Sequence, residues 1–214
     1  MGVLTVHSVQ KFVVSQNGKR VLFVGAEDKV TPAAVDWLKA ENVEIRPKPS
    51  EKPEQMTFLR GGELVPKTHP VITFRGMLDH LQAEILVVGS RLQGQLRTDL
   101  AEILTITRQI MRCQVLDEPW EERPICGMTA AELRQRSHEP QKYYGQGHFM
   151  PDFSDKPEIL ELNRLRTLVR KTELAGCRAM PEREDLLRVL NRLSSLLWIL
   201  MIREKREASD GTEC

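Results

Sequence analysis

The longest regular pattern of apolar positions begins at Pro70 and runs to near the C-terminus. Apolar side chains recur there every three or four residues, the spacing that places them on one face of an α-helix. Long helices are predicted from Pro70, after a break near Gly94, and over about residues 158–178 and 182–206. A short helix is predicted over residues 129–137, because Thr129 and Glu132 form a capping box. The positions that follow this spacing are Phe74, Met77, Leu78, Leu81, Ile85 and Val88, then Leu96, Leu100, Ile103, the polar Thr107 and Ile110, and in the last helix Leu186, Leu190, Leu193, Leu197 and Met201.

The N-terminal part has short apolar runs separated by turn residues and prolines. Asn17-Gly18 lies between two such runs, and this dipeptide favours the tight turn of a β-hairpin. Thr31-Pro32 is typical of a helix start, with the threonine as N-cap and the proline at the first helical position. The predicted elements are a hairpin over residues 10–24, with 12–14 in its first strand, a short helix to about residue 41, an extended stretch over 43–45, and a Pro-rich, charged linker over 46–56.

These patterns predict a mainly α protein in two parts. Residues 1–56 form a small α/β segment of hairpin and helix with its linker. Residues 57–214 form a bundle of four long helices plus a short one. Residues 139–157, between the short helix and the third long helix, are predicted to be a loop rich in aromatic side chains.

The composition narrows the possible functions. The chain has 214 residues and a net charge of +1, which argues against nonspecific binding to nucleic acid or to an anionic membrane. No apolar run approaches the roughly 20 residues of a spanning helix, and no signal peptide is evident. The four cysteines, Cys113, Cys126, Cys177 and Cys214, have no metal-finger spacing, so we expect neither zinc nor disulfides, and a reducing cytoplasm.

Polar side chains interrupt the predicted helices at positions that a plain bundle does not need. Arg166, Arg170 and Glu173 share one helix face, because they are spaced i, i+4 and i+7. Such a stripe is usually a solvated face, and Asn191 and Ser195 in the last helix are equally compatible with buried polar groups that fix the register of the bundle. Arginines on adjacent helices also suit phosphate. Spacing alone therefore predicts a helical bundle with a candidate anion site.

Several blocks of sequence occur in a distinctive order. They are KVTPAAVDWLKAENVEI (29–45), FRGMLDHLQAEIL (74–86), RQIMRCQVLDEP (108–119), MTAAELRQRSHEP (128–140), GHFMP (147–151), LNRLRTLVRKTE (162–173) and VLNRLSSLLWILMI (189–202). In this order they resemble the ATP:cobalamin adenosyltransferases, and the ethanolamine-utilisation type more closely than the propanediol-utilisation type. The resemblance covers most of the chain. It implies transfer of the 5′-deoxyadenosyl group of ATP to the cobalt of cob(I)alamin, with release of triphosphate.

The resemblance also assigns residues to the ATP site. It implies catalytic roles for Arg166, Arg170, Asp79 and Phe149. Mg²⁺ is expected to accompany ATP, and Glu173 is expected to pair either with an arginine or with this metal ion. Asp79 matches an acidic position that pairs with an arginine across a subunit boundary in the family, and Arg166 would be that arginine. This implies a homo-oligomer with active sites between protomers. The implied ATP-binding residues are Arg166, Arg170, Lys171, Glu173, Asn191 and Arg192.

The cobalamin end is implied by the residues that precede Pro151. The family packs a hydrophobic side chain against the lower face of cobalt, because removal of the axial ligand makes the metal easier to reduce. Strict alignment puts His148 at the position of that side chain, with Phe149 one residue later. We expect Phe149 to take the role, because an imidazole could itself ligate cobalt. His148, Phe149 and Met150 are therefore the expected cobalamin-binding residues.

Two departures from the family pattern qualify the resemblance. Some members of the ethanolamine-utilisation type carry a His and a Cys-Cys-x-x-Cys segment that binds a divalent transition metal. Here the linker over residues 46–56 takes its place, and no cysteine precedes Cys113. We expect activity without a structural transition metal. The Thr-Gly-Asp-Gly strand that contacts ATP in the propanediol type is also absent, so ATP contacts at that end must differ.

The implied setting is ethanolamine catabolism. The enzyme would supply adenosylcobalamin to ethanolamine ammonia-lyase, in the cytoplasm or inside a bacterial microcompartment. The expected partners are this lyase, a flavin reductase or microcompartment proteins, in addition to ATP and cobalamin. Two alternatives remain at this stage: a non-catalytic corrinoid carrier or chaperone, and a structural helical subunit of a microcompartment.

Overall fold

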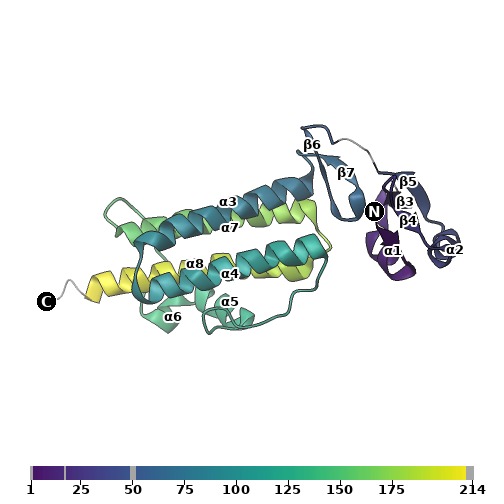
Figure 1. Cartoon of the computed structure of the whole chain (residues 1–214). Helices are drawn as coiled ribbons and strands as arrows, with labels where there is room; N and C mark the ends of the chain where they lie inside the picture. The colour runs from purple at the N-terminus through teal and green to yellow at the C-terminus, as the bar shows by residue number, and fades with distance from the viewer. Residues whose placement is uncertain (1, 17, 49–51, 211–214) are drawn as a thin grey trace. The chain divides into compact units, whose positions relative to one another are not determined.

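The computed structural model describes residues 2–16, 18–48 and 52–210 (Figure 1). The chain divides into two compact units, residues 1–69 and 70–214. The sequence instead placed the boundary after residue 56. The first unit extends to residue 69 because it includes a second small hairpin, formed by β6 (Met56–Phe58) and β7 (Leu64–Pro66).

The first unit combines short strands and two helices around its own small core. Strand β3 (Lys19–Val24) pairs antiparallel with β2 (Val14–Gln16) and parallel with β5 (Glu44–Pro47). The other elements are β1 (Val3–Leu4), α1 (Val6–Phe12), β4 (Lys29–Val30), α2 (Pro32–Ala40) and a 3-10 turn at Arg60–Gly62; β1 pairs parallel with β4. The buried residues of this core are Val9, Leu22, Ala34, Leu38 and Val43.

The predicted hairpin and helix of this unit are confirmed, with one correction. Val14 pairs with Val21 in the hairpin, although Asn17 lies outside the described residues. Thr31 caps α2 as expected, by accepting a hydrogen bond from the Ala34 amide. Residues 12–14 were expected in a strand, but Phe12 ends helix α1. Thr5 and Ser8 form the capping box of α1, with a serine where a glutamate or glutamine is usual.

The second unit is the predicted bundle of four long helices. They are α3 (Pro70–Arg91), α4 (Gly94–Leu116), α7 (Pro157–Ala179) and α8 (Glu184–Asp210). Helix α3 lies beside α4 and α7, and α8 lies beside α7 and α4, as Figure 1 shows. Apolar side chains from all four helices fill the centre, and Phe74, Ile103, Leu165 and Leu193 are fully buried. The fold is therefore the mainly α fold that the apolar spacing predicts.

Short helices cover one side of this bundle. Helix α5 (Ala130–His138) begins at the predicted capping box of Thr129 and Glu132. The expected loop over residues 139–157 contains a helix that the sequence analysis missed, α6 (Pro140–Tyr144), which Pro140 starts and Gly145 ends with a φ of 69°. The segment after Gly145 has no regular structure up to α7. Its position depends on packing against α8.

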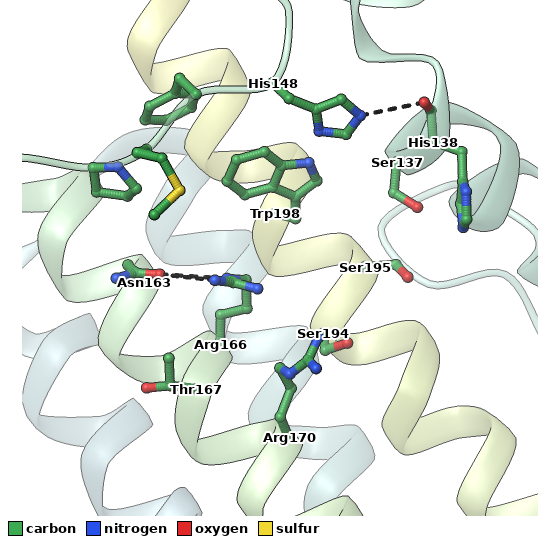
Figure 2. A pocket seen from close by; sticks show the side chains of 13 residues that line it. Ser137, His138, His148, Asn163, Arg166, Thr167, Arg170, Ser194, Ser195 and Trp198 are labelled. Atoms are coloured by element: carbon green, nitrogen blue, oxygen red, sulfur yellow. Dashed lines mark hydrogen bonds between the residues drawn. The ribbon is translucent and has the colours of Figure 1, made fainter.

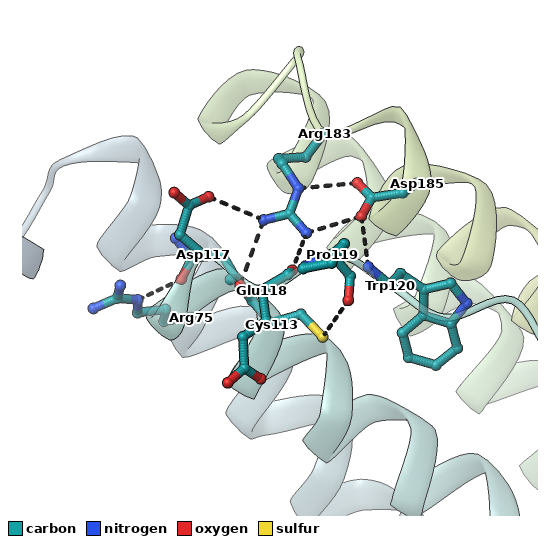
Figure 3. A network of polar contacts seen from close by, with 9 residues as sticks. Arg75, Cys113, Asp117, Glu118, Pro119, Trp120, Arg183 and Asp185 are labelled. Atoms are coloured by element: carbon teal, nitrogen blue, oxygen red, sulfur yellow. Dashed lines mark hydrogen bonds and ion pairs between the residues drawn. The ribbon is translucent and has the colours of Figure 1, made fainter. Parts of the chain in front are cut away.

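A polar network ties the connection after α4 to the start of α8 (Figure 3). The Arg183 guanidinium donates to the Asp185 carboxylate at 2.9 Å and to the Glu118 carbonyl at 2.7 Å. Asp185 also accepts the Trp120 amide at 3.0 Å. The Arg183 hydrogen bond, with help from backbone N–H groups, lowers the pKa of Asp185 to about 2. This network fixes the long connection that leads to α5.

Candidate active site

A cavity of about 580 Å³ opens between α7 and α8 in the helical unit (Figure 2). Arg166 and Arg170 come from α7, and Ser194, Ser195 and Trp198 come from α8. The C-terminal end of α5 and the irregular segment 148–151 complete the wall. A volume of this size is typical of small-molecule sites. The cavity has an aromatic end and a cationic end.

Three rings form the aromatic end. The His148 ring stacks on the Trp198 indole with centroids 5.7 Å apart and planes inclined by 11°. The Phe149 ring lies 5.3 Å from the same indole, inclined by 23°. His148 Nε2 lies 3.3 Å from the backbone carbonyl oxygen of His138. Met150 follows with 88% of its surface exposed, so it offers a free apolar side chain at the cavity rim.

Two arginines form the cationic end. The Arg166 guanidinium donates to Asn163 Oδ1 at 3.2 Å and lies 5.5 Å from the centre of the Trp198 ring. Arg170 is exposed on the next turn of α7 and makes no hydrogen bond or ion pair within the described part of the chain. Burial, and then the charge of Arg170, lowers the pKa of Arg166. Two like charges in a half-enclosed site favour an anionic ligand.

A chain of polar groups continues from the cationic end along α7 and α8. Asn191 Nδ2 donates to Glu173 Oε1 at 2.9 Å, and Asn191 Oδ1 accepts from the Arg192 guanidinium. Two other nitrogens of Arg192, Nε and Nη1, are buried without a hydrogen-bond partner. Burial is the main reason that the pKa of Arg192 is lowered. Buried N–H groups without an acceptor are costly, so these two donors fit an oxygen-rich ligand.

The structure separates the expected ATP residues into groups. Arg166 and Arg170 line the main cavity, whereas Arg192 lines a neighbouring cavity of about 70 Å³. Lys171 is exposed on α7 and lines neither cavity. Asp79 is exposed on α3 and has no hydrogen bond or ion pair with any described residue. Within one chain, the partner of Arg166 is therefore Asn163 and not Asp79.

Sequence reasoning missed Trp198 and Asn163. Trp198 occurs in a strongly apolar helix, where an aromatic residue is usually part of the core. Its spacing gave one usable signal, because it lies three and four residues after Ser195 and Ser194, which share its helix face. Asn163 lies three residues before Arg166 on α7, within reach of its guanidinium.

The part of the chain that the structure describes contains neither a cluster of metal ligands nor a membrane-spanning helix. Among residues 2–16, 18–48 and 52–210, no cluster of three or more His, Cys, Asp or Glu side chains is placed to hold a metal ion. Burial raises the pKa of the Cys113 thiol. Burial, together with Asp99 and Glu102, also raises the pKa of the Cys126 thiol. No helix among these described residues is both long and apolar enough to span a membrane.

Comparison with known proteins identifies the family. The family model described as cobalamin adenosyltransferase matches residues 49–204. The chain belongs to this family. The resemblance carried by the ordered sequence blocks is thereby confirmed.

Curated relatives share part of their length with this chain. The corrinoid adenosyltransferase EutT of Salmonella typhimurium is 33% identical over 158 residues, which are 71% of this chain and 59% of that protein. EutT of Escherichia coli K12 is 33% identical over 159 residues, which are 72% of this chain and 60% of that protein. The chain thus spans about three fifths of the length of these relatives.

Solved structures share the fold. A variant of the PduO-type ATP:corrinoid adenosyltransferase of Lactobacillus reuteri, complexed with cobalamin and ATP, gives a TM-score of 0.58 at 18% identity. The match covers 72% of this chain and 89% of that chain. Another variant of the same enzyme, complexed with ATP, gives 0.56 at 16% identity and covers 72% and 92% of the two chains. At this identity the likeness establishes a common fold.

Proposed function

We propose that this protein transfers the 5′-deoxyadenosyl group of ATP to the cobalt of cob(I)alamin, with release of triphosphate. The observation that carries the proposal is the cavity between α7 and α8, which has arginines at one end and stacked aromatic rings at the other. Membership of the cobalamin adenosyltransferase family supports it. The two ends match the two substrates, a polyanionic nucleotide and a flat, largely apolar macrocycle.

The arginines would bind the triphosphate. In the reaction the cobalt nucleophile attacks the ribose 5′ carbon, the carbon–oxygen bond breaks, and the electron pair leaves with triphosphate. The leaving group gains negative charge, so cations already in place stabilise the transition state more than the ground state. We assign this role to Arg166 and Arg170, which line the cavity, and Arg192, which lines the neighbouring cavity, would add to the positive charge.

Glu173 is the candidate partner of the magnesium ion that accompanies ATP. Carboxylate oxygens suit Mg²⁺, which is usually held by one or two carboxylates and by substrate phosphates. Asn191 orients one Glu173 oxygen at 2.9 Å, and the carboxylate lies on α7 one turn beyond Arg170. The ion would neutralise phosphate charge. Lys171, exposed beside Arg170, would add a longer-range positive charge.

Phe149 would exclude a lower axial ligand from cobalt. An axial donor stabilises Co(II) relative to Co(I), so its removal makes the reduction easier. Phe149 packs on Trp198 and partly faces the cavity, beside the exposed Met150 and His148. These three residues are the proposed contacts to cobalamin.

The catalytic site is proposed to lie between protomers of a homo-oligomer. Asp79 is an exposed carboxylate without a partner in the described part of its own chain, and Arg166 is an incompletely paired guanidinium. An Asp79–Arg166 pair across a subunit boundary would satisfy both. The proposed setting is the supply of adenosylcobalamin to ethanolamine ammonia-lyase, with a flavin reductase as electron donor, in the cytoplasm or in a microcompartment.

A spectroscopic assay tests the proposed activity. The protein is mixed with ATP, Mg²⁺ and chemically reduced cobalamin, and absorbance follows formation of alkylcobalamin. We expect adenosylcobalamin and one triphosphate for each cobalamin consumed. Absence of adenosylcobalamin at saturating ATP would overturn the enzymatic function. Tight corrinoid binding without turnover would then favour the alternative, a non-catalytic carrier.

A further inference from the structure

His148 and Phe149 stand side by side in the cavity wall, yet they would act on cobalt in opposite ways. An imidazole nitrogen with a free lone pair is a good ligand for a transition metal. A phenyl ring cannot donate in this way. If the site excludes a lower axial ligand, it must also restrain its own His148. The structure contains two contacts that would do so.

The first contact is the hydrogen bond of His148 Nε2 with the His138 carbonyl, at 3.3 Å. A carbonyl oxygen carries no hydrogen, so Nε2 must be the donor and must carry the proton. A protonated Nε2 has no lone pair for cobalt, while the neutral ring keeps one on Nδ1, so this hydrogen bond restrains His148 by fixing the position of the ring. His138 ends helix α5, which starts at a complete capping box, so the acceptor belongs to an ordered element.

The second contact is the stack on Trp198. The imidazole lies almost parallel to the indole, at 5.7 Å between centroids, and Phe149 packs on the same indole at 5.3 Å. Trp198 comes from α8, in the middle of a long helix whose flanking residues Leu197 and Ile199 are fully buried. The irregular segment after Gly145 therefore packs on a side chain that a regular helix holds in place.

Resting on the proposed function, we propose that Trp198 is a positioning residue that keeps His148 off cobalt and leaves Phe149 as the side chain under the corrinoid. Loss of the indole face would free the His148 ring to turn, to give up the His138 carbonyl and to ligate Co(II). The site would then hold a five-coordinate cobalt that is harder to reduce. Trp198 therefore acts through its neighbours and not on the reacting atoms.

The test uses the full chain with cob(II)inamide, a corrinoid without a nucleotide base of its own, at saturating ATP. ATP is kept saturating because Arg166, a proposed ATP contact, lies over the Trp198 ring. Weaker ATP binding after loss of the indole then does not affect the result. Electron paramagnetic resonance reports a nitrogen ligand on Co(II) as nitrogen superhyperfine splitting. We expect no splitting in the wild type, splitting in Trp198→Leu, and none in the Trp198→Leu/His148→Ala double variant. Trp198→Phe, which keeps an aromatic face, should behave as the wild type.

The rate of adenosylation from Co(II) with a reductant gives a second readout. We expect Trp198→Leu to be slower by about tenfold. Without the stacking contacts, the His148 ring is no longer held in the conformer that keeps it off cobalt. Removal of His148 from that variant should recover part of the rate. Phe153→Ala is the matched aromatic control, because Phe153 is fully exposed in the irregular stretch between Gly145 and α7.

Three results would overturn the inference. They are nitrogen splitting in the wild type, its absence in a Trp198→Leu protein that binds the corrinoid, and loss of corrinoid binding in Trp198→Leu that Trp198→Phe restores. The last would make Trp198 a direct corrinoid contact. Failure of the wild type to bind cob(II)inamide and to form adenosylcobalamin would instead refute the proposed function. Thermal unfolding of each variant separates these outcomes from misfolding.

Discussion

The two ends of the cavity are built in different ways. The cationic end consists of Arg166 and Arg170, spaced one turn apart on the regular helix α7. The aromatic end depends on an irregular segment, residues 145–151, that packs on Trp198 of α8. Helical periodicity therefore places the charges, whereas tertiary packing places the rings. We expect substitutions at the cationic end to affect ATP and those at the aromatic end to affect the corrinoid.

The largest effect is expected for Arg170→Ala. It removes a charged donor that would meet the departing triphosphate, and loss of one such preorganised donor typically costs about 10²–10³ in rate. We expect kcat/KM for ATP to fall by about that factor in steady-state assays with cob(I)alamin. Because Arg170 is exposed, the free energy of unfolding should stay within about 0.5 kcal/mol of the wild type.

Arg178→Ala is the control for this prediction. Arg178 is also an exposed arginine on α7, but it does not line the cavity. The Arg178→Ala substitution removes the same charge from the same helix and should leave kcat/KM for ATP nearly unchanged. Equal losses in both variants would mean that only the overall charge of α7 matters.

Asn191→Leu should disrupt the chain of polar groups next to the cationic end, in which Asn191 joins Glu173 to Arg192. It leaves the Glu173 carboxylate without its 2.9 Å donor and leaves the Arg192 guanidinium without its remaining hydrogen-bond acceptor. Unpaired, partly buried polar groups of this kind cost about 1–3 kcal/mol each. We expect chemical denaturation to show a lower free energy of unfolding, together with a higher KM for Mg-ATP. Unchanged values of both would show that the Glu173–Asn191–Arg192 chain has no role.

Asp185→Asn probes the structural network outside the main cavity. The carboxylate pKa is lowered from 3.8 to about 2 in the folded protein, chiefly by Arg183. Its stabilisation is complete above the unfolded pKa of 3.8 and is lost as the pH falls through 2. Since the side chain is 33% exposed, we expect about 1 kcal/mol. The difference in unfolding free energy between wild type and variant should shrink between pH 4 and pH 2; a constant difference would contradict the assignment.

The smallest effect is expected on removal of transition metals. The buried Cys113 and the partly buried Cys126 have raised pKa values and remain thiols at neutral pH, whereas metals bind thiolates. Treatment with a chelator, followed by replenishment of Mg²⁺, should leave activity intact. Alkylation at neutral pH should modify the exposed Cys177 before these two. Loss of activity that Zn²⁺, Fe²⁺ or Co²⁺ restores would show that a transition metal is needed.

The sequence predicted those parts of the molecule in which periodicity decides the structure. The four long helices, the cap of α5 and the shared face of Arg166 and Arg170 all follow from spacing along one element. The resemblance to a known family pointed to residues 147–151 as part of the site. These predictions needed no information about which element packs on which.

The remaining features depend on contacts between distant segments. Trp198 could not be distinguished from a core aromatic, because only the packing of His148 and Phe149 on its ring reveals the role. Arg192 was grouped with Arg166, yet its side chain lines a different cavity. Helix α6 was missed because five residues are too few to show a period. Side-chain direction and tertiary neighbours decide each of these cases.

The division of the cavity into two ends is tested most directly by giving two variants cobalamin in two oxidation states. Adenosylcobalamin formation is measured for Arg170→Ala and Phe149→Ala, first with preformed cob(I)alamin and then with cob(II)alamin and a reductant. Phe149→Ala should be severely slowed only from Co(II), because Co(I) needs no help in losing an axial ligand, whereas Arg170→Ala should be slowed from both states. Equal losses for both variants in both assays would contradict the division of the cavity into an ATP end and a corrinoid end.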